Sequence, residues 1–86
     1  MTDKYLPIGS VVMLNNAKKR VMIIGFKLIN KNDENKQFDY VGVLYPEGMV
    51  DLGYNMLFNH DQIEKIYYLG LIDDEEKEFK KKLNAS

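Results

Sequence analysis

The apolar residues of the chain fall into short runs rather than into long helical stripes. Val11–Leu14 is a first run, and Arg20–Ile29 is a second in which β-branched residues persist too irregularly for an amphipathic helix. Phe38–Tyr45 is a third run, with Gly42 at its centre. These runs predict three strands, and Gly25 predicts a bend or bulge in the second.

Polar turns separate these strands. Asn15–Lys19 joins the first pair, and the loop Asn30–Gln37 carries no apolar side chain, so it cannot contribute to a core. Pro46-Glu47-Gly48 ends the third strand in a tight turn. A small turn at Asp51–Gly53 is then expected before a fourth strand over Tyr54–Phe58.

A capping motif marks a helical turn in the second half of the chain. Asn59 can cap a turn over His60–Glu64, with Gln62 at the capping-box position. Lys65–Leu69 then returns to strand character, and Gly70 allows the chain to turn away.

A second capping box, Asp73 with Glu76, opens a final helix. The first turn of this helix is acidic and its last turn contains Lys80-Lys81-Lys82, an arrangement that complements the helix dipole. Phe79 and Leu83 give the helix a narrow apolar seam.

Together these elements predict an α+β domain. The sheet is expected to be small, strongly bent and antiparallel, or an SH3-like barrel, with about five strands and a short helical turn before the last one. At 86 residues the chain can form one core and is too short for two. A single domain is therefore expected over 1–86, with the sheet or barrel in 5–70 and the helix in 73–83.

Composition narrows the class of protein. The chain has no cysteine, which excludes disulfides, thiolate zinc sites and thiol nucleophiles and favours a cytoplasmic location. No apolar stretch approaches the roughly 20 residues needed to span a bilayer, and the N-terminus lacks a basic region followed by a long apolar run. We therefore expect a cytoplasmic protein that is not a membrane partner.

Catalytic chemistry is hardly represented in the sequence. His60 is the single histidine, and one imidazole supplies one ligand where zinc takes three or four. Ser10 has no nucleophile elbow around it. The acidic groups Asp33-Glu34 and Asp73–Glu76 are explained by a polar loop and a helix start, and the glycines form no phosphate-binding cluster. We expect no enzyme activity, no metal and no cofactor.

The charge of the chain disfavours nucleic acid as a partner. Twelve basic and thirteen acidic residues give a formal net charge of −1. Lys18-Lys19-Arg20 with Tyr5, Tyr40 or Tyr45 could form a mixed basic and aromatic surface, as in a small nucleic-acid-binding β-barrel. The favoured interpretation is a solvated turn, because release of counterions from phosphates needs several clustered cations.

Aromatic residues favour a protein-binding function. Five tyrosines exceed what one face of a small core can absorb: Tyr40, Tyr45, Tyr54, Tyr67 and Tyr68. Tyr67 and Tyr68 are adjacent, so in a regular strand they point to opposite faces and at least one should be exposed. The apolar run Val21–Ile24 needs cover on both faces, which either the C-terminal helix or a partner chain can provide.

Several blocks of the sequence are shared with a known family, and their order and spacing agree over almost the whole chain. The blocks are Leu6–Val12, Lys19–Gly25, Phe38–Gly42, Tyr45–Gly48, Phe58–Ile63 and Gly70 with the acidic helix after it. In these blocks the chain resembles small uncharacterised bacterial proteins whose genes lie in type VII (Esx) secretion clusters of Gram-positive bacteria. The resemblance implies a genomic setting beside LXG-type toxins and their small helical export partners, and it carries over no catalytic residue.

We therefore expect a non-enzymatic cytosolic accessory protein, a chaperone or adaptor, that binds a type VII secretion effector or another secretion component. An immunity protein that binds a co-encoded toxin is the alternative within the binding class. Self-association into a homo-oligomer is left open. Tyr45 is either a rigid anchor for a partner or a core residue under its turn. The expected partner-binding residues are Tyr40, Tyr45, Pro46, Glu47, His60 and Tyr68.

Overall fold

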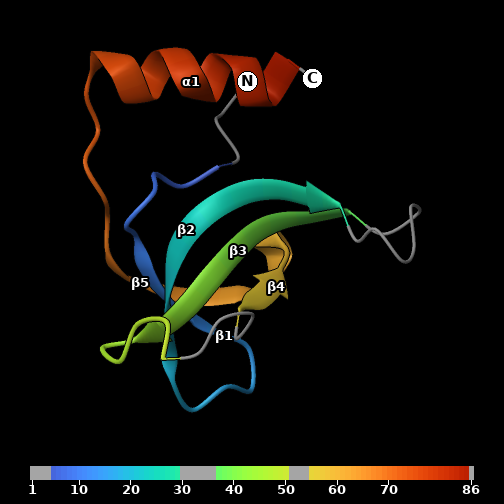
Figure 1. Cartoon of the computed structure of the whole chain (residues 1–86), viewed down its shortest axis with the longest axis vertical. Helices are drawn as coiled ribbons and strands as arrows, with labels where there is room; N and C mark the ends of the chain where they lie inside the picture. Colours follow the sequence, from blue (N-terminus) through green and yellow to red (C-terminus); the bar gives the residue numbers. More distant parts are fainter. Residues whose placement is uncertain (1–4, 30–36, 51–54, 86) are drawn as a thin grey trace.

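A computed structural model describes residues 5–29, 37–50 and 55–85 of the chain. Five strands form one antiparallel sheet in the order β4-β3-β2-β1-β5 (Figure 1). A 3₁₀ turn precedes the last strand and a helix follows it, which confirms the predicted α+β class. The elements are β1 (Val11–Leu14), β2 (Arg20–Ile29), β3 (Gln37–Tyr45), β4 (Met56–Phe58), η1 (His60–Gln62), β5 (Ile63–Tyr68) and α1 (Asp74–Ala85).

Element boundaries differ from the predicted ones by a few residues. The helical turn predicted over His60–Glu64 stops at Gln62, because Ile63 already pairs with Leu14 in the sheet. Pairing with β1 thus ends the local helical preference. Some predicted features lie outside the described residues, namely Tyr54, the small turn at 51–53 and the loop segment 30–36.

A bulge bends β2. Its register against β3 shifts between Ile23 and Gly25, and Figure 1 shows the strand curving along its length. A Cβ atom at Gly25 would meet the Cγ1 atom of Val41 at 2.7 Å, which is closer than van der Waals contact allows. Glycine therefore lets β3 approach the bend, as the sequence predicts.

The hydrophobic core lies on one face of this sheet. Val12, Val21 and Ile23 are fully buried there, because alternate residues of β1 and β2 point to the same face. The ring of Tyr40 stacks on Phe58 with 5.3 Å between the centroids. Such a ring pair contributes about 0.5–1.5 kcal/mol beyond the area that it buries.

The helix α1 packs through its narrow apolar seam. The Oδ1 atom of Asp73 accepts the N–H of Glu76 at 2.9 Å, so the Asp73 half of the predicted capping box forms. The other half does not form, because the Oε2 atom of Glu76 binds the Nζ atom of Lys80 at 2.9 Å and its Oε1 atom has no hydrogen-bond partner among the described residues. The ring of Phe79 contacts Phe26 with 5.8 Å between the centroids, and Leu83 packs against the core cluster. The helix is thereby attached to the sheet near Phe26, in the second half of β2.

Side-chain hydrogen bonds fix η1 to β3. The Oε1 atom of Gln62 accepts the N–H of Asn59 at 2.8 Å, which confirms the predicted capping-box pair. The Oδ1 atom of Asn59 accepts the N–H of Asp39 at 3.1 Å, and the Oδ2 atom of Asp39 accepts the N–H of His60 at 2.9 Å. These bonds satisfy a backbone donor of β3 and two backbone donors at the start of the turn.

Replacement of Asn59 by alanine tests this junction. Asn59 stands at the start of the turn, and the substitution removes its side-chain oxygen, which accepts the N–H of Asp39 in β3. We therefore expect a loss of about 0.5–2 kcal/mol in the free energy of unfolding. Urea denaturation measures the loss, and Asn55→Ala, at an exposed asparagine, is the control. An unchanged midpoint for Asn59→Ala would show that the hydrogen bonds of Asn59 do not hold the turn.

Candidate functional site

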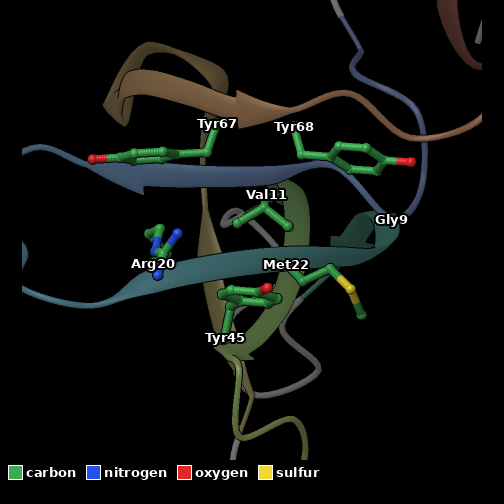
Figure 2. A pocket seen from close by; sticks show the side chains of 7 residues that line it. All are labelled: Gly9, Val11, Arg20, Met22, Tyr45, Tyr67 and Tyr68. Carbon is green, nitrogen blue, oxygen red and sulfur yellow. The ribbon is translucent and has the colours of Figure 1, made fainter.

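A groove lies on the face of the sheet opposite the core, and its volume is about 450 Å³ (Figure 2). Binding sites for small ligands typically enclose roughly 300–1,000 Å³, so the groove can take up a few side chains of a partner. We term it the tyrosine groove. Its walls are Gly9, Val11, Arg20, Met22, Tyr45, Tyr67 and Tyr68.

Strand register explains why these side chains share a face. Val11 pairs with Met22 across β1 and β2, and Arg20 pairs with Tyr45 across β2 and β3. Directly opposed residues of antiparallel strands point to the same side of the sheet. Their neighbours in sequence, such as Val21, point into the core.

Both Tyr67 and Tyr68 line the groove, so the prediction that they point to opposite faces is wrong. The register between β1 and β5 shifts at this point: Val11 lies opposite Tyr68, whereas Val12 lies opposite Ile66. Tyr67 is therefore an extra residue in β5, and a bulge of this kind reorients side chains. Tyr67 is 47% exposed and Tyr68 is 64% exposed, as a surplus of tyrosines led us to expect.

Two cations lie against the aromatic walls. The guanidinium carbon of Arg20 lies 4.9 Å from the ring centroid of Tyr45 and 5.1 Å from that of Tyr67. The Nζ atom of Lys65 lies 4.9 Å from the centroid of Tyr67. Each such contact contributes about 0.5–1 kcal/mol at an exposed site and orients the ring.

Of the predicted partner-binding residues, Tyr45 and Tyr68 line the groove, and Pro46 and Glu47 form the turn that follows Tyr45. The carboxylate of Glu47 binds the Nζ atom of Lys19 at 2.6 Å. This hydrogen bond lowers the pKa of the Glu47 carboxyl. Glu47 is thus exposed, but its charge is already matched within the chain.

Tyr40 lies in the core and not in the groove. Its side chain is fully buried, and its hydroxyl oxygen accepts the N–H of Leu6 at 3.0 Å. The same hydroxyl is hydrogen-bonded to the Nδ1 atom of His60 at 2.7 Å, with donor and acceptor set by the histidine tautomer. Burial raises the pKa of Tyr40 to about 12. In this structure Tyr40 joins three parts of the chain and is not accessible to a partner.

His60 is likewise placed by core contacts. Its backbone is held by Asp39 and its ring lies 5.9 Å from that of Tyr40, centroid to centroid. In the described stretches, no three histidine, aspartate or glutamate side chains are grouped so that they could hold a metal ion. The structure therefore brings Tyr45 and Tyr68 together and separates them from Tyr40 and His60.

The expected partner-binding residues did not include Val11, Arg20, Met22 and Tyr67, which also line the groove. From the sequence, Arg20 was interpreted as part of a basic turn, whereas it is the first residue of β2. Alternation along β1 and β2 is the signal that places Val11 and Met22 on a common face. The contribution of Tyr67 depends on the bulge in β5, and no glycine or proline within β5 marks that bulge.

Residues 5–79 match the model of a protein family described as a domain of unknown function (DUF4176). The chain belongs to this family. The DUF4176 match includes the whole sheet, every residue of the tyrosine groove and the first half of α1. Among curated proteins and among solved structures, this DUF4176 chain has no match. In the part of the chain that the structure describes, no helix is long and apolar enough to cross a membrane.

The buried hydroxyl of Tyr40 should make the stability of this DUF4176 protein depend on alkaline pH. Burial raises its pKa to about 12, so the folded state keeps a proton that the unfolded state loses near pH ~10. The stabilisation is present below pH ~10 and is lost as the pH rises through the folded pKa. The full loss approaches about 3 kcal/mol, because one pKa unit corresponds to about 1.4 kcal/mol.

Urea unfolding at several pH values between ~9 and ~12 measures this loss, with Tyr40→Phe as the control. The variant has no titrating hydroxyl at this position, so its free energy of unfolding should fall less over the same range. Tyr40→Phe should also be less stable than the wild type at neutral pH, because the N–H of Leu6 loses its acceptor. Parallel curves for the two proteins would contradict the prediction.

Proposed function

We propose that this DUF4176 protein is a non-enzymatic cytosolic accessory protein that binds a type VII secretion effector, or another secretion component, through the tyrosine groove. The observation that carries the proposal is an aromatic groove on a sheet face that the chain's own helix leaves uncovered. The secretion context comes from the resemblance in the sequence blocks.

The position of α1 is the first support. The apolar run Val21–Ile24 requires cover on both faces, and α1 was one candidate for that cover. The helix instead contacts the sheet through Phe26 and Phe79, and none of the groove-lining residues belongs to α1. Met22 thus lies in a groove that a partner chain can fill.

Exposed tyrosines are the second support. Tyrosine is enriched at protein interfaces because its rigid ring supplies a large contact area and loses little entropy on binding. Tyr45, Tyr67 and Tyr68 provide three such rings from two strands, and Arg20 lies between two of them. Tyrosine and arginine are also the residues that most often dominate binding energy.

An exposed apolar segment beside the groove is the third support. It runs from the second half of β5 into the connection to α1, and its exposed fractions range from 45% to 73%. These side chains add apolar surface that a partner can cover beyond the walls of the groove. The segment comprises Ile66, Tyr67, Tyr68, Leu69, Leu71 and Ile72.

Capture from cells that express the neighbouring secretion genes tests the proposal. The tagged protein should recover an LXG effector or a secretion component, identified by mass spectrometry, and deletion of its gene should lower export of that effector. Recovery without any secretion-related protein would contradict the proposal. Protection of a toxin-expressing cell with unchanged export would favour the immunity alternative instead.

Replacement of Tyr45 by alanine tests the groove itself. Tyr45 is 38% exposed, so its removal should lower the thermal midpoint only by the few degrees that loss of its contact with Arg20 accounts for. Affinity for the captured partner should fall by ~30-fold or more, because truncation of a central aromatic residue commonly costs about 2 kcal/mol of binding. Leu57→Ala, at an equally exposed residue on β4 at the other edge of the sheet, is the control. A large fall in the midpoint for Tyr45→Ala would instead assign the ring to the stability of the fold.

A further inference from the structure

Among the described residues, Arg20 contacts two aromatic rings and takes part in no ion pair. Its guanidinium carbon lies about 5 Å from two ring centroids, at 4.9 Å from Tyr45 and at 5.1 Å from Tyr67 (Figure 2). The ion pairs among the described residues join Lys19 with Glu47 and lysines of α1 with glutamates of the same helix, and Arg20 takes part in none of them. Arg20 is partly buried, and its guanidinium group has five N–H donors. Such a group is suited to a ligand that carries a carboxylate.

Lys65 is a second cation that contacts the ring of Tyr67. Its Nζ atom lies 4.9 Å from the Tyr67 centroid, and it too has no carboxylate partner in the described part of the chain. Two cations that have no ion-pair partner among the described residues therefore contact one ring, in a protein whose formal net charge is −1. The groove has a local positive charge that the overall composition does not indicate.

We infer that the tyrosine groove binds a short acidic segment of a partner protein, with a carboxylate on Arg20 and a neighbouring apolar side chain on Val11 and Met22. The guanidinium is planar and binds a carboxylate through two parallel hydrogen bonds. The paired residues Val11 and Met22 supply the apolar floor next to it. This inference rests on the proposed function, because it defines the chemistry of the same partner.

The arrangement of charges favours a carboxylate over a phosphate backbone. Lys19, the next cation along the chain, is already paired with Glu47 at 2.6 Å. Arg20 and Lys65 are therefore the cations that contact the groove-lining ring of Tyr67. Nucleic-acid binding, by contrast, needs several cations clustered along the phosphate backbone. Two cations beside an apolar floor match one or two acidic side chains within an apolar sequence.

Titration of the full-length ¹⁵N-labelled protein with two matched peptides tests the inference. The probes are acetyl-Leu-Glu-Phe-Glu-Leu-amide and the same peptide with glutamine in place of both glutamates. The acidic peptide should shift the backbone amide signals of Val11, Met22 and Tyr68. It should bind about tenfold or more tightly than the glutamine peptide, because a hydrogen bond to a charged group is worth more than a neutral one.

Variants separate the role of Arg20 from general charge. Arg20→Gln should remove the preference for the acidic peptide, and Arg20→Lys should restore part of it by keeping the charge without the planar fork. Lys18→Gln removes the same unit charge from the neighbouring turn and should leave the preference unchanged. Thermal midpoints confirm that each variant is folded, and the glutamine peptide measures any general damage to the groove.

Three results would overturn the inference: equal affinity for both peptides, shifts confined to residues outside the groove, or tighter and strongly salt-dependent binding of a twelve-nucleotide oligothymidine. The last result would assign the groove to single-stranded nucleic acid. Failure of the proposed function is separable. If wild type and Arg20→Gln capture an effector equally, the proposed function is supported and the inference of an acidic segment is contradicted. If the acidic peptide binds selectively but no effector is captured, the inference is supported and the proposed function is contradicted.

Discussion

Much of this small fold depends on one buried hydroxyl. The ring of Tyr40 fills the core against Phe58, and its oxygen is bonded to the backbone of Leu6 and to the ring of His60. Three segments that are remote in sequence are thereby joined: the chain before β1, the strand β3 and the turn η1. A domain of 86 residues has few core contacts to spare, and a polar group in its core must be satisfied by partners of its own.

The two faces of the sheet differ because one of them is covered by that core. One face holds Val12, Val21, Ile23 and the aromatic cluster, whereas the other presents the tyrosine groove. The helix α1 packs beside Phe26 and leaves the groove open. The core and the proposed binding groove therefore lie on opposite faces of the same strands, and an exposed groove residue such as Tyr68 can change with little effect on the core.

Local signals made much of the fold predictable from the sequence. The capping box at Asn59, the cap that Asp73 provides for α1 and the bulge at Gly25 depend on residues close to one another in the chain, and these three features form. The side to which each tyrosine points was not predictable in the same way. Tyr40 and Tyr45 look alike in sequence, yet they are five positions apart and lie on opposite faces of β3. Residues an odd number of positions apart in a regular strand point to opposite faces, so this spacing could have predicted the difference.

The bulge in β5 was not predictable, because it arises from pairing with β1 and not from a turn residue. Its register shift brings both Tyr67 and Tyr68 to one face and thereby gives the groove its second aromatic wall. The contact of Arg20 with the rings of Tyr45 and Tyr67 was also not predicted, because basic residues beside a turn are usually solvated. Long-range pairing and side-chain contacts across strands thus determine the site, whereas the local sequence determines the elements.

The strand order has a consequence for the timing of assembly. β5 is the last strand in sequence but pairs with β1, the first, so Tyr67 joins Val11 and Arg20 across more than half of the chain. The segments up to β3 are synthesised before β5, and until β5 pairs with β1 they have an unpaired β1 edge and lack the second wall of the groove. A partner that requires both walls can recognise the protein only after folding is complete, so binding reports on the finished domain and not on the growing chain.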